Sequence, residues 1–226
     1  REDSEEAVLE RVVQIATKLY ARQEEAGREG RPKESFQVMS PRHVGTVGVT
    51  NLNARLREPL NPKRPGLQEM RLGSEIIRED DRVMVVKNNY DWDIFNGDVG
   101  KVQKLHRNDR EVEIKIHGPP IQYVRIPFKD AAEYLRLAYC TTVHKMQGSE
   151  ADIVVIPVVN GFSHQLQRNL FYTAITRARK RVLLIGHLSA LVRAIENNNP
   201  DERNTLFLDR LRKLSSAGGT EVSVPV

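Results

Sequence analysis

The sequence predicts an α/β protein in which a small β domain interrupts a mostly parallel sheet. Residues 135–196 show strands that alternate with helices, and such alternation is typical of a parallel sheet with crossover helices. Residues 81–128 instead show short strands separated by turn residues, which is typical of a small barrel. Residues 4–26 carry apolar side chains at helical spacing, and this spacing indicates an amphipathic helix.

The first part of the α/β domain is expected at residues 1–72. The apolar stripe of its helix comprises Val8, Leu9, Val12, Val13, Ala16, Leu19 and Tyr20. Asp3 and Glu6 have the spacing of a capping box at the start of this helix. A short buried strand is expected at 35–40, and a helix is expected at 49–60, where the breaker-rich segment NPKRPG follows.

The inserted domain is expected at residues 73–132. Its strands read RVMVVK, DVGKVQKL, EVEIKIH and IQYVRIPF, and the turn segments FNGD, HRNDRE and HGPP separate them. Four or five short strands in about 50 residues predict a small SH3-like β-barrel.

The α/β pattern resumes at residues 133–214. Its expected elements are a strand at 136–140, a strand at 153–158, a helix at 165–179, a strand at 181–186 and a helix at 188–196. Residues 215–226, with the sequence SSAGGTEVSVPV, are expected to form a flexible tail.

The composition is that of a folded protein without a membrane span. Hydrophobic residues make up 39% of the chain, which is enough for a packed core. The 35 basic and 30 acidic side chains leave a net charge of +5, which permits a polyanionic partner without requiring one. The longest apolar run, 153–159, is far shorter than the roughly 20 residues that a membrane span needs. A single cysteine, Cys140, excludes an internal disulfide and predicts a reducing, cytoplasmic location.

No segment of the sequence provides a phosphate-binding P-loop. The stretch GDVGKV at 97–102 has the wrong glycine spacing, and Val102 replaces the required hydroxyl residue. Asn96 and Gly97 instead predict a hairpin turn. No acidic pair ends an apolar strand in the manner of a magnesium-holding Walker B motif. We therefore expect the chain alone not to hydrolyse a nucleoside triphosphate. Because it opens on Arg1 rather than Met, we also expect it to be part of a longer protein.

The segment 141–150 has the side chains of half a nucleotide site. Gly148 permits close approach of the backbone to a ligand, and Glu150 supplies an acceptor suited to a ribose hydroxyl. The other contributors are hydroxyl groups and phosphate-binding side chains: Thr141, Thr142, Ser149, His144 and Lys145. The alternative is an ordinary solvated turn in which His144 is a hydrogen-bonded structural residue.

Residues 173–181 place four cations at the end of a predicted helix: Arg177, Arg179, Lys180 and Arg181. The simpler interpretation of such a run is a solvated face. Arg177 differs in its setting, because it follows the semi-apolar segment LFYTAIT, which packs the helix and fixes its position. A fixed guanidinium stabilises the oxygens of a transferring phosphoryl group. Arg177 is therefore the catalytic candidate, as an arginine finger delivered to a P-loop on another domain.

The predicted insert offers a basic and aromatic surface. Lys87, Tyr90 and Trp92, with Lys101, are candidates for a surface on which bases stack. Equally, the aromatic side chains fill the core of a small barrel or cap a hairpin, and the residues alone leave both interpretations open.

Four segments resemble the RecD-like branch of superfamily 1 DNA helicases. VHKMQGSEADIVVIPV and YTAITRARKRVLLIG resemble motifs V and VI of that family. FQVMSPRHVGTVGVTNLNARLREPLNP resembles its motif IV region, and KNNYDWDIFNGDVGKV resembles its small SH3-like insertion. The resemblance covers roughly residues 35–187, with the motifs in the family's order.

This resemblance implies a fold and an activity. The α/β part would be the second RecA-like motor domain, 2A, and the insert would be its subdomain 2B. The family binds ATP and Mg²⁺ between two RecA-like domains. Most contacts to ATP and Mg²⁺ would come from the N-terminal RecA-like domain of the parent protein. Helicases of this family move along single-stranded DNA, in this branch usually 5′ to 3′, in processes such as DNA repair and recombination.

The resemblance also assigns roles to residues. Arg177 matches the arginine finger of motif VI. Nucleotide contacts are expected at Gly148, Ser149, Glu150 and Arg42. Contacts to nucleic acid are expected at Thr141, Thr142, His144, Lys145, Lys87, Tyr90 and Trp92. The family usually has a second arginine, which senses the γ-phosphate. Its place falls at Val44 here, and Arg42 takes the role if the loop register shifts by two residues.

The sequence therefore predicts the C-terminal motor fragment of an ATP-dependent DNA helicase. Such a fragment completes the ATP site, contacts single-stranded DNA and is inactive alone. The alternative is a non-catalytic module that binds single-stranded nucleic acid through its insert. A motor half kept only for assembly is a weaker third possibility, because Arg177 and Glu150 are both intact.

Overall fold

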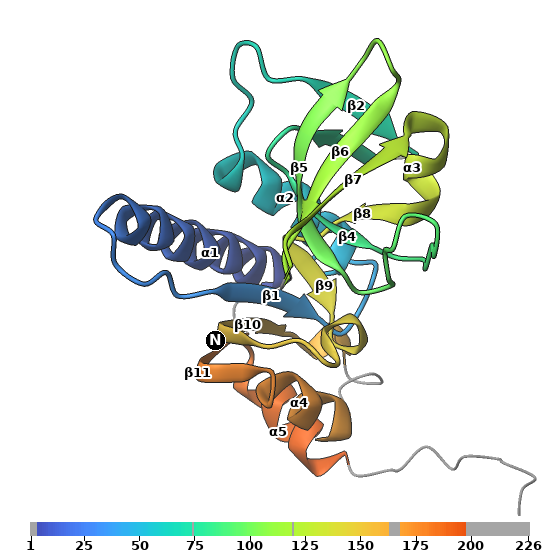
Figure 1. Cartoon of the computed structure of the whole chain (residues 1–226). Helices are drawn as coiled ribbons and strands as arrows, with labels where there is room; N and C mark the ends of the chain where they lie inside the picture. Colours follow the sequence, from blue (N-terminus) through green and yellow to red (C-terminus); the bar gives the residue numbers. More distant parts are fainter. Residues whose placement is uncertain (1–3, 74, 119, 163–167, 198–226) are drawn as a thin grey trace, which may run out of the picture.

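The structure is a computed structural model that describes residues 4–73, 75–118, 120–162 and 168–197. Its elements are, in chain order, α1 (Glu5–Arg28), β1 (Phe36–Ser40), α2 (Val49–Leu60), β2 (Glu69–Leu72), β3 (Glu75–Arg78), β4 (Arg82–Val85), β5 (Val99–His106), β6 (Glu111–Ile116), β7 (Gln122–Pro127), α3 (Phe128–Tyr134), β8 (Leu135–Leu137), β9 (Cys140–Thr142), η1 (His144–Met146), β10 (Ala151–Val158), η2 (Asn160–Phe162), α4 (Arg168–Ile175), β11 (Ala178–Gly186) and α5 (Leu188–Glu196). They form a parallel sheet with helices on both faces and an antiparallel sheet above it (Figure 1).

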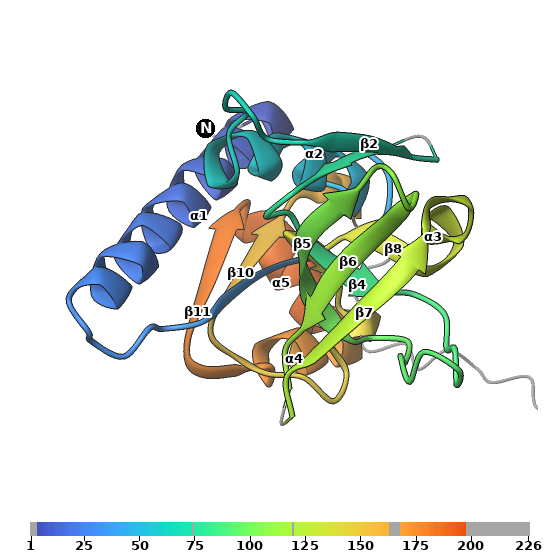
Figure 2. The ribbon, with the colours of Figure 1, turned by 45° about the horizontal axis from the view of Figure 1, so that its top comes forward.

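The parallel sheet has four strands in the order β11-β10-β1-β9. Phe36 of β1 pairs with Ile153 of β10, and Val38 pairs with Cys140 of β9. All five residues of β1 are buried, as expected for a strand with neighbours on both edges and helices on both faces. α1 and α2 cover one side, and α4 and α5 cover the other (Figure 2). The predicted α/β class with a parallel sheet is therefore confirmed.

α1 begins at Glu5, two residues after the predicted capping position. Its N-cap is Ser4, whose Oγ accepts a hydrogen bond from the Ala7 N–H at 3.2 Å. Asp3 of the predicted capping box lies outside the described residues. The predicted apolar stripe faces the sheet, with Val8, Leu9, Val12 and Ala16 all buried.

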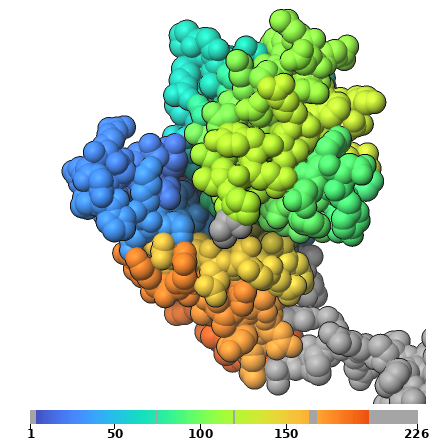
Figure 3. Space-filling model, in the orientation of Figure 1, coloured from blue at the N-terminus to red at the C-terminus, as the bar shows by residue number. Residues whose placement is uncertain are grey.

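The inserted region forms an open antiparallel sheet and not a closed barrel. Its five strands run in the order β7-β6-β5-β4-β8, and β2 and β3 form a separate hairpin. In the described part of the chain, no pairing joins β7 to β8. The chain instead passes from β7 directly into α3, which packs against both strands. The sheet stands as a lobe above the parallel-sheet domain, and α1 lies beside both (Figure 3).

The predicted strand at 136–140 is divided between the two sheets. β8 pairs antiparallel with β4, whereas β9 pairs parallel with β1. Between them, the Ala138 N–H donates to the Arg82 carbonyl at 2.9 Å, which holds the chain where it crosses from one sheet to the other. The predicted insert, 73–132, contains β3 to β7, and β8 follows it while still belonging to the antiparallel sheet.

Two predicted helices of the α/β part have the bounds that the sequence indicated, and a third is shorter. α2 covers Val49–Leu60 and α5 covers Leu188–Glu196, as predicted. α4 ends at Ile175, because β11 already begins at Ala178. Residues 165–167 of that predicted helix and the predicted tail at 215–226 lie outside the described residues.

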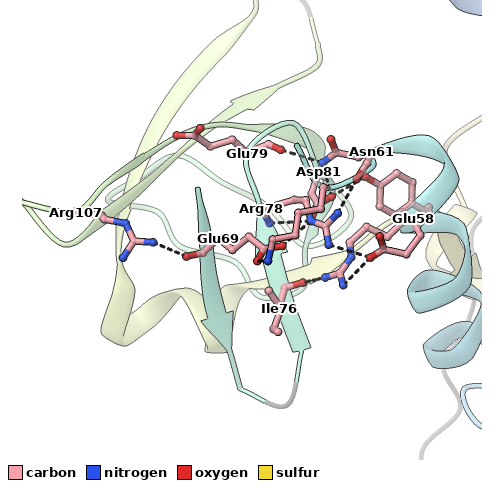
Figure 4. Close-up of polar contacts among 11 residues, drawn as sticks. Glu58, Asn61, Glu69, Ile76, Arg78, Glu79, Asp81 and Arg107 are labelled. Atoms are coloured by element: carbon pink, nitrogen blue, oxygen red, sulfur yellow. Dashed lines mark hydrogen bonds and ion pairs between the residues drawn. The ribbon is translucent and has the colours of Figure 1, made fainter. Parts of the chain in front are cut away.

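A polar network with a buried centre joins α2, the hairpin of β2 and β3, and the residue before β9 (Figure 4). The Arg78 guanidinium forms ion pairs with Glu58 at 2.9 Å and Glu69 at 3.0 Å, although its side chain is only 3% exposed. The Asp81 carboxylate, which is fully buried, accepts hydrogen bonds from the Arg78 N–H, Asn61 Nδ2 and the Tyr139 hydroxyl, each at 2.8 Å. We call these residues (Glu58, Asn61, Glu69, Arg78, Asp81 and Tyr139) the joint, because they hold the inserted region on the parallel-sheet domain.

Candidate functional site

β10 and β11 begin side by side, and their first residues bring Glu150 and Arg177 to the same end of the sheet. Ala151 pairs with Ala178, and the Ala151 N–H donates to the Arg177 carbonyl at 3.0 Å. The preceding loop turns at Gly148, whose φ of +84° favours glycine. Glu150 and Arg177 are 27 positions apart in sequence, yet strand pairing makes their backbones neighbours.

Arg177 differs from the three cations that follow it. Arg179 pairs with Asp152 at 3.7 Å, Lys180 pairs with Glu34 at 3.2 Å, and Arg181 pairs with Glu34 at 2.5 Å. The Arg177 guanidinium donates to oxygens of its own helix end, to the Thr173 carbonyl and Thr176 Oγ1, both at 3.3 Å. Within the described ranges it has no carboxylate partner.

The position of Arg177 is fixed from both sides. Phe171 and Ala174 of α4 are buried, so the helix is docked against the sheet. The Arg177 N–H donates to the Ala174 carbonyl at 3.3 Å, and its own carbonyl is bonded to β10. The backbone is therefore held by a helix and by a sheet, while the positive charge stays available.

Glu150 and Ser149 are also available to a ligand. Glu150 is exposed, and no hydrogen bond or ion pair of its carboxylate is found among the described residues. The Ser149 N–H donates to the Met146 carbonyl at 3.0 Å, which fixes the loop without using the hydroxyl. We call Gly148, Ser149, Glu150 and Arg177 the open end of the sheet.

Arg42 lies at the opposite end of the parallel sheet. It follows β1, whereas Glu150 and Arg177 precede their strands, and β10 alone separates the two ends by roughly 25 Å. Its Nη1 donates to the Gly161 carbonyl at 2.8 Å, and its guanidinium lies 5.9 Å from the centre of the Phe162 ring. Val44 is 66% exposed. The structure does not bring Arg42 to the open end.

The remaining residues of the 141–150 segment cluster near Arg42's end of the sheet. Thr141 and Thr142 are buried at the end of β9, and His144 is exposed. Thr142 Oγ1 accepts from the Lys145 N–H at 3.3 Å, and Lys145 Nζ donates to Asn96 Oδ1 of the inserted region at 2.5 Å. Loop and insert are therefore linked through Lys145.

A cavity of about 410 Å³ opens beside these residues, between β9 and α2 on one side and β4, β8 and α3 on the other. Thr141, Thr142 and Lys145 line it, together with His43, Thr50 and Arg136, which the sequence reasoning did not select. His43 could have been selected from the sequence, because it adjoins Arg42. Arg136 carried no local signal, since it alternates with Leu135 and Leu137 as any exposed strand residue does.

Two of the three residues of the insert that were predicted to contact nucleic acid, Lys87 and Trp92, interact with side chains of α3. Lys87 pairs with Glu133 and lies 5.5 Å from the centre of the Tyr134 ring. The hydrogen bond that the Lys87 ammonium donates to Glu133 raises the pKa of Lys87. Trp92 packs edge-on against Tyr134, with ring centres 5.1 Å apart. Tyr90 is 79% exposed and touches Phe95 at its edge.

The predicted turn at Asn96 and Gly97 is present, and it is not a phosphate loop. The Asp98 N–H donates to the Phe95 carbonyl at 3.0 Å, and Gly97 has a φ of +106°. In the described part of the chain, no group of three or more His, Cys, Asp or Glu side chains is placed to hold a metal ion. None of the described helices combines the length and apolar character needed to cross a bilayer.

Two family models match the chain. Residues 137–185 match the UvrD-like helicase C-terminal domain, and residues 52–116 match the SH3 domain of ATP-dependent RecD-like DNA helicases. The ATP-dependent RecD2 DNA helicase of Deinococcus radiodurans is 34% identical over 178 residues, which are 79% of this chain and 24% of that protein. The RecBCD enzyme subunit RecD of Mycolicibacterium smegmatis is 33% identical over 114 residues, which are 50% of this chain and 19% of that protein.

Solved structures show the same fold at low identity. A Bacteroides Pif1 bound to single-stranded DNA has a TM-score of 0.51 and 17% identity, and it covers 81% of this chain and 46% of its own. A structure described as two coordinating Pif1 helicases at forked double-stranded DNA has a TM-score of 0.52 and 16% identity. The match covers 98% of this chain and 55% of the Pif1 chain.

The fold, the open end and the first family model together define the C-terminal region of a superfamily 1 helicase. Within that class the chain belongs to the RecD-like helicases, because both the inserted domain and the two relatives named above are RecD-like. The chain spans about a quarter of the length of the curated relatives it matches.

Proposed function

We propose that this chain is the C-terminal motor part of an ATP-dependent DNA helicase that works 5′ to 3′ on single-stranded DNA. Its open end would complete an ATP site whose P-loop and Mg²⁺ ligands belong to the N-terminal RecA-like domain of the parent protein. The observation that carries the proposal is the pairing of β10 with β11, which places Glu150 beside an Arg177 that lacks an acidic partner in the described residues. The relatives' names as ATP-dependent helicases agree with this role.

Arg177 has the properties that phosphoryl transfer demands of a finger. Charge spreads over the equatorial oxygens of the transferring group, and a planar, permanently charged donor stabilises it. The neighbouring cations pair with Glu34 and Asp152, whereas Arg177 has no carboxylate partner among the described residues. The backbone bonds on both sides of Arg177 reduce the entropy lost when it engages the phosphate.

Glu150 and Gly148 would bind the sugar and not the reacting phosphate. An ionised carboxylate accepts hydrogen bonds only, which suits it to the hydroxyls of a ribose. Gly148 lets the loop approach the nucleotide closely. A Cβ at this position would meet no protein atom within 4 Å, so glycine is favoured here by the backbone conformation and not by crowding within the protein. Ser149, between them, presents a hydroxyl to the same ligand. ATP would supply the transferred phosphoryl group once bound.

The opposite end of the sheet would contact DNA. His144 is exposed there, and Thr141, Thr142 and Lys145 line the cavity of about 410 Å³ between the two sheets. Hydroxyls and cations of this kind bind the phosphate backbone without reading sequence. Because loop 143–150 runs from this end to the open end, it would couple DNA contacts to the nucleotide. Tyr90 would offer a base a stacking surface, while Lys87 and Trp92 would support it from within the insert.

Arg177→Ala in the full-length parent tests the proposal, with Arg179→Ala as the matched control. DNA-stimulated ATP turnover of Arg177→Ala should fall by about 10³-fold or more, the scale of a lost arginine finger. ATP binding, measured with a fluorescent analogue, should persist. Arg179→Ala should keep turnover within about twofold, because its guanidinium is engaged by Asp152 at an exposed position. Equal turnover of wild type and Arg177→Ala would refute the role.

A further inference from the structure

A second cavity, of about 400 Å³, lies between α1, the start of β1 and the inserted sheet. Tyr20, Glu24 and Lys33 line it from the α1 side, and Arg82, Lys101 and His117 line it from the inserted sheet. Figure 3 shows α1 and the inserted sheet side by side above the parallel-sheet domain. Of the residues proposed above for ATP or DNA, Lys101, a sequence-based candidate for base stacking, lines this cavity, and the others do not.

Arg82 lines the cavity with most of its donors unused. Its Nη1 donates to the Phe36 carbonyl at 3.2 Å, and within the described ranges no carboxylate pairs with it. A guanidinium has five N–H donors in a fixed fork that matches a phosphate or carboxylate. Burial lowers the pKa of Arg82.

The acidic side chains of the lining are already engaged by other cations. Glu24 pairs with Lys33 at 3.7 Å, and Asp80 pairs with Lys101 at 2.8 Å and also with Arg64. Neither carboxylate is therefore left to neutralise Arg82.

The positive charges also act on the neighbouring His117. Its pKa is lowered, first by partial burial of the ring and then by the cations Arg82, Lys115 and Lys101. Lys115 faces this group because it pairs with Lys101 across β5 and β6. Arg82, Lys101 and His117 thus line one cavity, whose carboxylates, Glu24 and Asp80, both pair with lysines.

We infer that this cavity is a binding site for a phosphate group, held by Arg82 with Lys101 and His117 at its rim. The forked donor of Arg82 suits two phosphate oxygens, and a lysine ammonium adds a point charge. The cavity falls within the size range of small-ligand sites. The phosphate group comes either from a free phosphate compound or from a nucleic-acid backbone, and both share this chemistry. The inference does not rest on the proposed helicase function.

Titration of the 226-residue chain with inorganic phosphate tests the site by calorimetry. Arg82→Gln should weaken binding by about tenfold or more, because a charge-assisted contact is lost. Lys101→Gln should weaken it by roughly threefold, since its ammonium is half exposed and shared with Asp80. Lys104→Gln, an exposed residue of the same strand outside the lining, serves as the matched control and should leave binding unchanged.

Ring resonances of His117 provide a readout that does not depend on a variant. Phosphate should shift them in the wild-type chain and leave those of His43 in place, because His43 lines the other cavity. A ten-nucleotide thymidine oligomer replaces phosphate in a parallel titration. If the oligomer shifts His117 at concentrations where free phosphate does not, the source is the nucleic-acid backbone. If phosphate alone shifts it, the source is a free phosphate compound.

Two results would overturn the inference. One is that neither probe, at up to about 10 mM, produces a saturable shift of the His117 ring resonances. A titration to this concentration would detect binding with a Kd in the millimolar range or below. The other is equal phosphate affinity of the wild type and a folded Arg82→Gln. If circular dichroism shows Arg82→Gln to be unfolded, Lys101→Gln and the His117 shift decide the matter.

Discussion

The joint and the open end are built from the same kinds of polar residue, and they differ in what those residues bind. At the joint, Asp81 is fully buried and accepts three hydrogen bonds from the protein itself. At the open end, Glu150 is exposed and Arg177 contacts oxygens of its own helix end. Polar groups that satisfy one another hold a fold together, whereas polar groups left open are available to a ligand. We therefore expect changes at the joint to reduce stability and changes at the open end to reduce activity.

Two carboxylates show the electrostatic side of this difference. Burial raises the pKa of Asp81, despite its three donors. The Ser35 N–H, at 2.9 Å, lowers the pKa of Asp152 near the start of β10. The part of the stability that depends on protonation of Asp81 is therefore present at low pH and is lost as pH rises through its raised pKa. The contribution of Asp152 is present above the unfolded pKa and is lost as pH falls through its lowered pKa.

The largest expected effect on the isolated chain comes from Asp81→Ala. This change leaves the Tyr139 hydroxyl, Asn61 Nδ2 and the Arg78 N–H without their acceptor. The free energy of unfolding should fall by about 3 kcal/mol, because each buried donor left unsatisfied costs about 1 kcal/mol or more. Urea-induced unfolding measures it. Asp91→Ala, in an exposed loop of the insert, is the control and should change stability by less than about 0.5 kcal/mol. Similar losses in both variants would erase the distinction between the two regions.

A change at the open end should show the reverse pattern. Glu150→Ala in the full-length parent should raise the KM for ATP by about 10- to 100-fold, because a hydrogen bond to a charged group contributes about 1.5–3 kcal/mol. Its unfolding midpoint in urea should stay at the wild-type value, since Glu150 has no partner among the described residues. Glu196→Ala, also exposed, is the control for both measurements. A marked loss of stability in Glu150→Ala would place that residue with the joint.

The smallest expected effect belongs to Asp152→Asn. At pH 7 it should lower the free energy of unfolding by about 1 kcal/mol, because the hydrogen bonds from Ser35 lose their charged acceptor. The difference from wild type should shrink as pH falls below about 4, where the unfolded chain's aspartates become protonated. Urea titrations at several pH values measure this. A difference that grows on acidification would contradict the lowered pKa of Asp152.

The sequence allowed some elements to be predicted closely because their ends carry local signals. The bounds of α2 agree with the prediction, since Gly48 precedes it and NPKRPG follows. The division of residues 135–142 into β8 and β9 was not predictable in the same way. LRLAYCTT is apolar or strand-forming throughout, and hydrophobic pattern does not say which sheet a residue joins. The joint was equally hidden, because Asp81 and Tyr139 meet across 58 positions.

The candidate site shows how far motif reasoning reaches. Glu150 and Arg177 were selected from the sequence, and strand pairing supplies their proximity. The distance between Arg42 and Arg177 was in fact implied by the predicted topology. Arg42 follows a strand while Arg177 precedes one, and in a parallel sheet those positions lie at opposite ends. The availability of Arg177 depended on which acids its neighbours meet, and only the folded structure shows that Glu34 and Asp152 take them.

The central place of β1 in the parallel sheet has a consequence for synthesis of the chain. Val38 pairs with Cys140 and Val155, which leave the ribosome about a hundred residues later, or roughly 5–20 s at ordinary translation rates. During that interval the apolar strand FQVMS has neither neighbour, and both of its edges can pair with other chains. α1, which is made before β1 and covers it with its apolar stripe, is the element positioned to shield it. Nascent chains with a weakened α1 should therefore aggregate before the insert is complete, even if the finished protein would be stable.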